Sequence, residues 1–238
     1  MPETSKKMRL DKFLTQAAEL TRSEAKQKIK KGSITVNGEI IKKPEVKVSV
    51  QDEIRLDGKV ISYEKYRYIM LHKPAGVVSA TEDAECRTVL DLIHEGKKGL
   101  FPVGRLDKDT EGLLLLTNDG ALAHNLLSPK KHVDKTYFAV LDGAVGEKEQ
   151  ELFLQGLDIG DEKKTLPAKL ELTDKENEVF ITVQEGRFHQ VKRMAQAVGR
   201  KVIYLKRISM GSLVLDDTLE KGEYRSLTEK EIAELKNR

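Results

Sequence analysis

Cysteine is nearly absent from this chain of 238 residues, which contains only Cys86. A single thiol cannot form a disulfide within the chain, and this fits a reducing compartment. A chain of this length buries roughly 70–75% of the surface that its unfolded form exposes, so it needs no covalent cross-links to fold. The length suits one large domain, or a catalytic domain with a small appendage.

Long apolar segments are also missing. Apolar runs such as Leu113–Leu116 are far shorter than the roughly 20 residues of a membrane-spanning helix. Residues 1–7 are polar and lack the apolar centre of a secretory signal peptide. We therefore expect a soluble, cytoplasmic protein that has no membrane partner, and we take a monomer as the default.

The sequence has no glycine-rich phosphate loop of the Walker type. Its five histidines and its one cysteine show no spacing typical of metal ligands. The histidines are His72, His94, His124, His132 and His189. We therefore expect no metal and no cofactor.

Positive charge is concentrated at the N-terminal end. Residues 1–50 hold twelve Lys and Arg but six acids, an excess of six, so the overall charge of +3 leaves −3 for the remainder. Such asymmetry suggests a basic module that binds a polyanion. A solvated, lysine-rich helix face would give a similar pattern, so charge alone does not decide between the two interpretations.

The first 62 residues predict a compact unit of two short helices and a few strands. Apolar residues recur at a helical period over 9–19, and Thr21 with Glu24 forms a capping box for a second helix that ends near Gly32. Strand patterns follow, with hairpin turns at Asn37-Gly38 and Asp57-Gly58. We expect residues 63–67 to be a linker.

Residues 68–238 interleave strand and helix patterns. We expect an α+β domain in which helices flank a mixed, mostly antiparallel sheet. The predicted strands are 68–71, 113–117, 136–141 and 179–183, and the predicted helices are 89–93, 121–127, 147–156, 188–198 and a last one capped by Thr228.

The N-terminal unit resembles a known RNA-binding module. Its motifs are Arg-Leu-Asp-Lys-Phe-Leu (9–14), Thr-Arg-Ser-Glu-Ala (21–25) and Gly-Ser-Ile-Thr-Val-Asn-Gly (32–38). They resemble the αL module, which a ribosomal protein of the small subunit shares with several RNA-modifying enzymes. The resemblance implies recognition of RNA shape by exposed cations. The candidate RNA-binding residues are Arg9, Lys12, Arg22, Lys26, Lys30 and Lys31.

An unusual segment, Gly-Arg-Leu-Asp-Lys-Asp-Thr-Glu-Gly (104–112), holds three carboxylates and two cations before an apolar strand. By local pattern alone, acids that cap turns are the commonest explanation. An EF-hand calcium loop is excluded, because Asn118 stands where the bidentate Glu belongs and a strand follows. The third interpretation is catalytic, with Asp107 as an attacking carboxylate beside basic groups.

The longer run 104–120 resembles the hallmark motif of pseudouridine synthases. Three further motifs match in order: Asp-Lys-Thr-Tyr (134–137), Glu-Gly-Arg-Phe-His-Gln-Val-Lys-Arg-Met (185–194), and Leu-Lys-Arg-Ile (205–208) with Gly211. With the αL module, the resemblance covers nearly the whole chain. The basic helix and the ending Gly-Glu-Tyr-Arg-Ser-Leu-Thr (222–228) are most similar to the branch that modifies small-subunit 16S rRNA.

The resemblance implies a role for each matching residue. Asp107 would be the catalytic aspartate, Lys192 its basic partner, and Tyr137 would stack on the uracil and relay a proton. Leu205 would pack on the uracil face, and Arg105 would hold the displaced RNA backbone. His189 shares a predicted helix side with Lys192, while Arg187 and Arg193 would contact phosphate or brace the loop.

Pseudouridine formation breaks the N–C bond between uracil and ribose, rotates the base and rejoins it through carbon. It needs neither redox change nor cofactor, but the uridine must be extruded from its stack. The residues leave open whether Asp107 attacks the base or the ribose, or assists proton removal. They also leave open whether the target lies in large-subunit rRNA, and whether the substrate is bare RNA or an assembling subunit. A non-catalytic assembly factor remains an alternative function. A DNA-binding regulator is a weak alternative, because the sequence shows no helix-turn-helix pattern.

Overall fold

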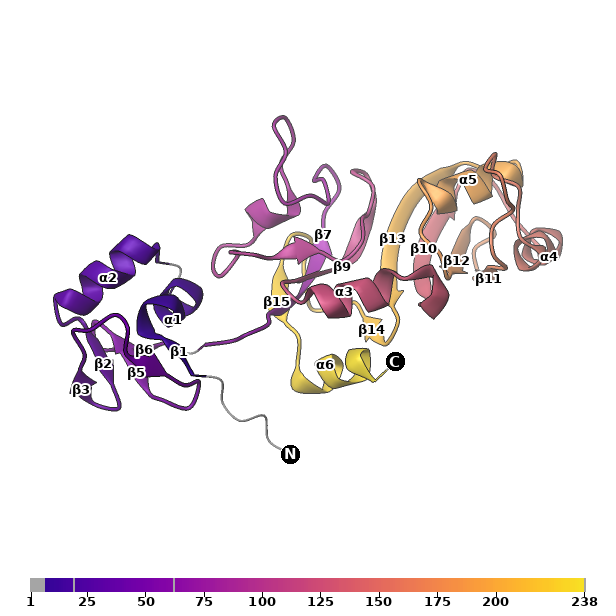
Figure 1. Ribbon diagram of the computed structural model, residues 1–238. Coiled ribbons are helices and arrows are strands. Elements are labelled where there is room, and N and C mark those ends of the chain that lie inside the picture. The colour runs from indigo at the N-terminus through magenta and orange to yellow at the C-terminus, as the bar shows by residue number, and fades with distance from the viewer. Residues whose placement is uncertain (1–6, 19, 62, 238) are drawn as a thin grey trace. The chain divides into compact units, whose positions relative to one another are not determined.

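The computed structural model describes residues 7–18, 20–61 and 63–237. Expectations that involve residues 1–6, Glu19, Ser62 or Arg238 lie outside the described residues. The chain divides into two compact units, one ending at Lys65 and one beginning at Tyr66 (Figure 1). No helix among the described residues is long and apolar enough to cross a membrane.

The N-terminal unit packs two helices on short strands around a small core. Phe13, Leu14 and Ile29 from the helices bury their side chains against Ile34 and Ile54. Its strand pairings are β1 with β4 and the order β3-β2-β5-β6. The elements are β1 Met8–Arg9, α1 Leu10–Ala17, α2 Arg22–Lys30, β2 Ile34–Val36, β3 Glu39–Ile40, β4 Lys47–Val48, β5 Ile54–Leu56 and β6 Lys59–Ile61.

The capping box and the hairpin turns predicted for this unit form in the structure. The Thr21 hydroxyl accepts from the Glu24 amide, and the Glu24 carboxylate accepts from the Thr21 amide, which completes the capping box of α2. Asn37-Gly38 and Asp57-Gly58 both have positive φ at their two residues, which matches the twist of the hairpins β2–β3 and β5–β6.

The second unit is built on one sheet with the order β11-β12-β10-β13-β9-β7-β15, to which β14 and β8 add at β13 and β9. Among the pairings of named strands in the described residues, the β13–β9 pairing alone is parallel, so the predicted mixed, mostly antiparallel α+β class is confirmed. Its strands are β7 Tyr68–Lys73, β8 Phe101–Pro102, β9 Glu111–Thr117, β10 Lys135–Leu141, β11 Lys169–Leu172, β12 Glu178–Val183, β13 Val202–Met210, β14 Leu213–Val214 and β15 Tyr224–Ser226. Its helices are η1 Val89–Leu92, α3 Gly120–Leu127, η2 Pro129–Lys131, α4 Glu147–Gln155, α5 Gln190–Ala197 and α6 Glu229–Lys236.

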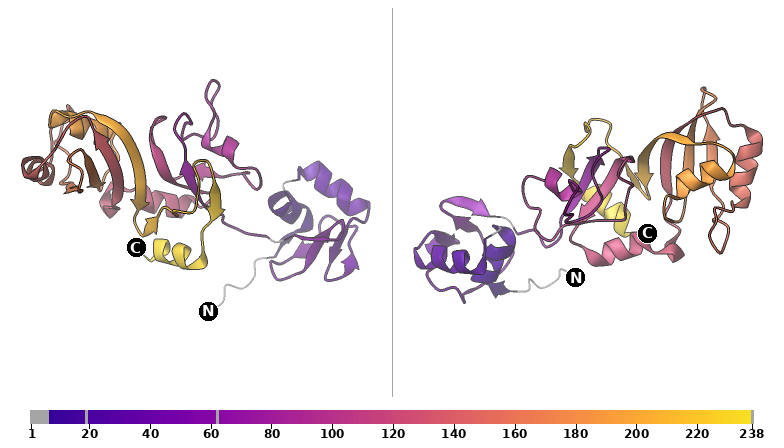
Figure 2. Two further views of the ribbon diagram at one scale, coloured as in Figure 1. Left: turned by 180° about the vertical axis from the view of Figure 1, so that it is seen from behind. Right: turned by 90° about the horizontal axis from the view of Figure 1, so that it is seen from above.

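Strand β9 is the centre of this unit, because both of its faces are buried. Leu114 and Leu116 belong to one apolar cluster, and Leu113 and Leu115 belong to the other. The apolar run of the sequence is therefore a central strand between two cores, as expected of a strand covered on both sides. Strands β10, β12 and β13 lie side by side in all views (Figures 1 and 2).

The sequence prediction missed strands β8, β11, β13, β14 and β15, and it was wrong in two helices. The segment predicted as helical over 89–93 is one 3₁₀ turn, η1. Helix α5 begins at Gln190 rather than at Phe188, because His189 has a φ of +47° and cannot continue a right-handed helix. The Gln190 side-chain oxygen accepts a hydrogen bond from the Arg187 amide at 3.0 Å, which fixes this start.

Gly112 allows β9 to join β13. The two strands pair in parallel over only two residues, where Gly112 lies opposite Arg207. Gly112 has a φ of +104°, and a Cβ on it would lie 2.2 Å from the Arg207 carbonyl oxygen. Only glycine satisfies both the backbone angle and the close approach of the neighbouring strand.

Replacing Gly112 with alanine should therefore destabilise the fold by about 2–4 kcal/mol, since the clash involves backbone rather than a flexible side chain. Urea denaturation followed by circular dichroism measures the change. Gly120→Ala is the matched control, because Gly120 has open space around it and starts helix α3. Equal stability of the two variants would contradict this account of the junction.

Candidate active site

A cavity lies where the loop 104–110, the strands β10 and β13 and the start of α5 meet. Seven of the candidate residues from the sequence line it, although they are far apart along the chain. They are Arg105, Asp107, Tyr137, Arg187, His189, Lys192 and Leu205. Arg193 does not line this cavity.

Asp107 lies between two groups that can carry positive charge. Its Oδ2 is 3.0 Å from Lys192 Nζ, and its Oδ1 is 3.6 Å from His189 Nε2. About a quarter of the side chains of Asp107 and Lys192 remains exposed. The carboxylate is thus reachable from the cavity while it is held on one side by an ammonium. The pairing of Asp107 with Lys192 is as the resemblance implied, but His189 reaches Asp107 from the turn before α5 rather than from the helix.

Lys192 is shared by two carboxylates. Its Nζ also donates to Asp109 Oδ1 at 2.6 Å. Burial lowers the pKa of Lys192, but the hydrogen bonds to Asp109 and Asp107 outweigh burial and raise it overall. The same hydrogen bond lowers the pKa of Asp109, which does not line the cavity and is largely exposed. Lys192 therefore stays charged between the two acids at neutral pH.

The loop that carries Asp107 rests on a buried lysine. Lys73 at the end of β7 is fully buried, and its Nζ donates to the carbonyl oxygens of Pro74, Asp107, Lys108 and Thr110 at 2.8–3.3 Å. Burial lowers the pKa of this amine to about 8, against the nearby carboxylates that raise it. One amine thereby ties three residues of the loop to the end of a central strand.

Two more contacts fix the same loop to the segment after β7. Ser79 Oγ accepts from the Leu106 amide and donates to the Leu106 carbonyl, and the Gly76 amide donates to the Lys108 carbonyl at 2.7 Å. The sequence analysis did not single out residues 73–79 and missed these roles. A signal was present, because a lysine that ends a strand as apolar as Tyr68–Leu71 is buried and must find acceptors.

One face of the sheet forms a wall of the cavity that Asp107 also lines. Tyr137 lies next to Arg207 across β10 and β13, and Leu205 lies next to Ala139. Side chains alternate along strands, so Tyr137 and Leu205 share the face that lines the cavity. Lys135 and Arg207 are two buried cations on this wall, and the sequence analysis did not single them out as site residues.

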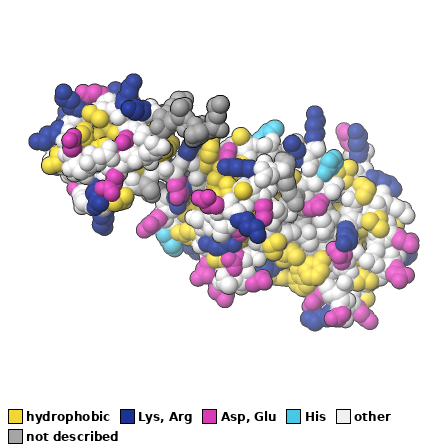
Figure 3. All heavy atoms as spheres, turned by 90° about the horizontal axis from the view of Figure 1, so that it is seen from below, with side chains coloured by type: hydrophobic (Ala, Val, Ile, Leu, Met, Phe, Trp, Pro, Cys, Tyr) yellow, Lys and Arg dark blue, Asp and Glu magenta, His cyan; other side chains and the backbone are white. Residues whose placement is uncertain are grey.

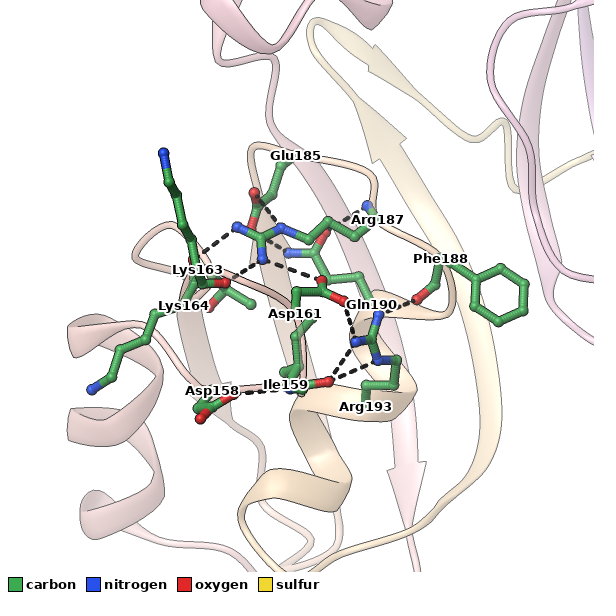
Figure 4. A network of polar contacts seen from close by, with 12 residues as sticks. Asp158, Ile159, Asp161, Lys163, Lys164, Glu185, Arg187, Phe188, Gln190 and Arg193 are labelled. Atoms are coloured by element: carbon green, nitrogen blue, oxygen red, sulfur yellow. Dashed lines mark hydrogen bonds and ion pairs between the residues drawn. The ribbon is translucent and has the colours of Figure 1, made fainter.

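Arg187 and Arg193 brace the entrance to α5 (Figure 4). The Arg187 guanidinium donates to Glu185 and Asp161 and to the carbonyls of Lys163 and Lys164. The Arg193 guanidinium contacts Asp161 and the Ile159 carbonyl, and its Nη1 donates to the Phe188 carbonyl at 3.1 Å. Of the two roles expected for these arginines, bracing is the one that the contacts display.

The third acid of the segment turns away from the cavity. Glu111 pairs with Lys221 at 2.8 Å and accepts from the Tyr204 hydroxyl at 2.7 Å. Burial raises the pKa of Glu111, but these two partners lower it overall. Among residues 7–18, 20–61 and 63–237, no group of three or more His, Cys, Asp or Glu is arranged to hold a metal ion.

The six candidate RNA-binding cations of the N-terminal unit are all exposed. Dark blue Lys and Arg side chains project from this unit in Figure 3. Arg9 and Arg22 differ from the four lysines, because both approach the buried carboxylate of Asp11, at 2.9 and 3.7 Å. The sequence analysis did not foresee this ion cluster, which orients the two arginines at the starts of α1 and α2.

Each of the two units matches a known protein family or domain. Residues 67–197 match the family model described as RNA pseudouridylate synthase, and residues 8–54 match the S4 domain. A Bacillus subtilis protein named "Uncharacterized RNA pseudouridine synthase YtzG" is 47% identical over 94% of this chain and 97% of its own length.

Two further relatives are named "Ribosomal small subunit pseudouridine synthase A". The Haemophilus influenzae protein is 43% identical and the Vibrio cholerae protein 45% identical, each over 96% of this chain and 99% of its own length. A solved structure titled "Crystal structure of pseudouridylate synthase" superposes with a TM-score of 0.69 at 42% identity, covering 96% of this chain and 99% of that one.

Replacing Lys73 with methionine should loosen the loop 104–110. The variant keeps the length of the side chain but leaves carbonyl acceptors in the loop unpaired. Amide hydrogen exchange at Gly76 and Thr110, whose amides donate to loop carbonyls, should become at least about tenfold faster. Lys148→Met on the exposed face of α4 is the control. Unchanged protection in the Lys73 variant would contradict the anchoring role.

The buried amine also predicts a pH dependence of stability. The pKa of Lys73 is about 8 in the folded chain and 10.5 in its ordinary state, so between these values the unfolded chain binds the extra proton. The free energy of unfolding of the wild type should therefore rise relative to Lys73→Met between pH 8 and 10.5, by up to about 3 kcal/mol. Below pH 8 the difference should be level. Chemical denaturation across this range measures it, and a difference that stays flat or falls would rule out a depressed pKa.

Proposed function

Because the chain belongs to the family of RNA pseudouridine synthases, we propose that its target is one uridine of small-subunit 16S ribosomal RNA. The chain is an isomerase with an S4 RNA-binding domain before its catalytic domain. The support for this target is the full-length similarity to two proteins whose names specify the ribosomal small subunit. Acting on ribosomal RNA would place the enzyme in the cytoplasm.

Asp107 is our candidate for the nucleophile, and one observation carries this assignment. Two carboxylates line the cavity, and the second, Glu185, is fully engaged. One oxygen of Glu185 accepts from the Leu166 amide and from Gln190, and the other accepts from Arg187. The Asp107 carboxylate instead contacts Lys192 and His189, which line the same cavity, and a quarter of its side chain is exposed. A carboxylate that is held but not enclosed can reach a bound uridine.

Lys192 would act through Asp107 rather than on the base. An ammonium at 3.0 Å attracts the carboxylate and orients one of its oxygens, leaving the other for the substrate. Asp109 is a second ligand of the same ammonium and compensates its charge. The arrangement supplies a negative nucleophile without a metal ion.

Tyr137 and Leu205 would hold the extruded uracil. They share one sheet face and line the same cavity as Asp107, so a flat base that packs on them would lie beside the carboxylate. During the reaction the bond from N1 to the ribose breaks, the base turns, and a bond from C5 to the ribose forms. The proton leaves C5 and N1 regains one, so atoms and electrons balance without a cofactor.

The RNA must distort to deliver the uridine. Extrusion costs a few kcal/mol of stacking. The exposed Arg105 lines the cavity next to Asp107 and could hold the displaced backbone there. The exposed cations Lys12, Lys26, Lys30 and Lys31 of the S4 domain would add affinity for phosphates wherever the RNA contacts that domain.

The test is to map pseudouridine chemically in small-subunit and large-subunit rRNA transcripts after incubation with the protein. Each transcript is used bare and bound to early ribosomal proteins. We expect one new pseudouridine in a small-subunit substrate and none with Asp107→Asn. Modification confined to the large-subunit RNA would contradict the proposed target. Tight binding without modification of any substrate would instead favour the role of an assembly factor.

Asp109→Asn is the matched control for the nucleophile. Both aspartates contact Lys192, but only Asp107 lines the cavity. We expect Asp107→Asn to lose at least about a thousandfold in rate, and Asp109→Asn to lose less than about tenfold. Equal losses in the two variants would mean that the shared ion pair, rather than attack by Asp107, carries the effect.

A further inference from the structure

Phe188 is the most exposed large hydrophobic side chain among the described residues, at 76% exposed. It lies at the rim of the cavity that contains Asp107, in the turn before α5. Exposing a phenylalanine ring to water is unfavourable, and a polar residue at this position would not disturb a core. A partner that covers the ring would remove this unfavourable exposure.

The ring is exposed although its backbone is firmly held. The Phe188 carbonyl accepts from Arg193, the Arg187 amide is bonded to Gln190, and both arginines are tied to Asp161. In Figure 4 the Phe188 ring points away from this network. The turn that exposes the Phe188 ring is therefore held in place by hydrogen bonds and ion pairs.

The ring stacks on the histidine that approaches the catalytic carboxylate. The rings of Phe188 and His189 are 3.8 Å apart at their centroids and 19° from parallel. The left-handed conformation of His189 accompanies this arrangement of adjacent residues. His189 Nε2 lies 3.6 Å from Asp107 Oδ1, so the stack leads from the carboxylate to the outside of the cavity.

We propose that Phe188 is a stacking platform for an unpaired nucleobase of the RNA substrate, adjacent to the uridine that enters the cavity. An aromatic ring beside a cation is the combination with which proteins bind single-stranded nucleic acid, and Arg105 lines the same cavity. Extrusion of a uridine leaves its neighbour without one stacking partner, and the free face of Phe188 replaces that partner.

The platform serves binding rather than the chemical step. Loss of one base–aromatic stack should weaken RNA binding about 5- to 100-fold. Phe188→Ala should therefore raise KM by that factor and leave kcat near the wild-type value. Phe188→Trp should restore binding, while Phe188→Leu should not, because leucine keeps apolar bulk without a π face. Leu154→Ala, which removes a similarly exposed apolar side chain from α4, should change nothing.

The experiment reports the stack directly. A short RNA spanning the uridine that the wild type modifies carries 2-aminopurine on either side of it, and Asp107→Asn protein binds the RNA without converting it. We expect stacking on Phe188 to quench the fluorescence of one of the two probes. The quenching should be absent with the Phe188→Ala/Asp107→Asn double variant and present with Phe188→Trp/Asp107→Asn.

The inference rests on the proposed function, since it requires a uridine delivered to Asp107, but the two can fail separately. If the wild type modifies large-subunit RNA, that RNA supplies the probe and only the proposed target is lost. Unchanged KM in Phe188→Ala, equal rescue by leucine, or quenching that persists without the ring would overturn the platform. So would a loss confined to kcat at saturating RNA, which would mean that Phe188 only positions His189.

Discussion

The buried ammonium of Lys73 is the interaction on which the rest of the catalytic unit depends. A charged amine away from water must be surrounded by acceptors, and here backbone carbonyls of the loop 104–110 supply most of them. The loop has no regular secondary structure of its own, and Lys73 contacts more of its residues than Ser79 or Gly76 does. Because Lys73 ends a strand that is buried on both faces, it ties the position of Asp107 to the interior of the fold.

Charge in the cavity is arranged around a second lysine, in a different manner. Lys192 is only partly buried, and its hydrogen bonds to two carboxylates raise its pKa, whereas burial lowers the pKa of Lys73. The two lysines therefore have different roles. Lys73 shapes the loop through hydrogen bonds to backbone, and Lys192 places a positive charge beside the proposed nucleophile.

The entrance to α5 joins the contacts of Asp107 to the rim of the cavity. Arg187 and Arg193 use their guanidinium groups to tie the turn before the helix to residues 159–164, and so they leave His189 and Phe188 in fixed positions. His189 then faces Asp107 and Phe188 faces outward. Arg187 and Arg193, for which phosphate contacts were one expectation, thus bind protein groups. Phe188, which lies between them in the sequence, has its side chain exposed.

Local patterns in the sequence determined the class of the fold, the capping boxes at Thr21 and Thr228, the hairpin turns and the apolar strand β9, because caps, turns and side-chain periods act over a few neighbouring residues. Motif resemblance selected Asp107, Tyr137, Lys192 and Leu205, which one cavity brings together. The roles of Lys73, Ser79 and Asp109, and the start of α5 at Gln190, were decided only by the tertiary structure. Lys73 meets the carbonyl of Asp107 across 34 positions, and Lys192 meets Asp109 across 83. Such contacts depend on how strands and loops pack against one another, and no pattern of neighbouring residues encodes that packing.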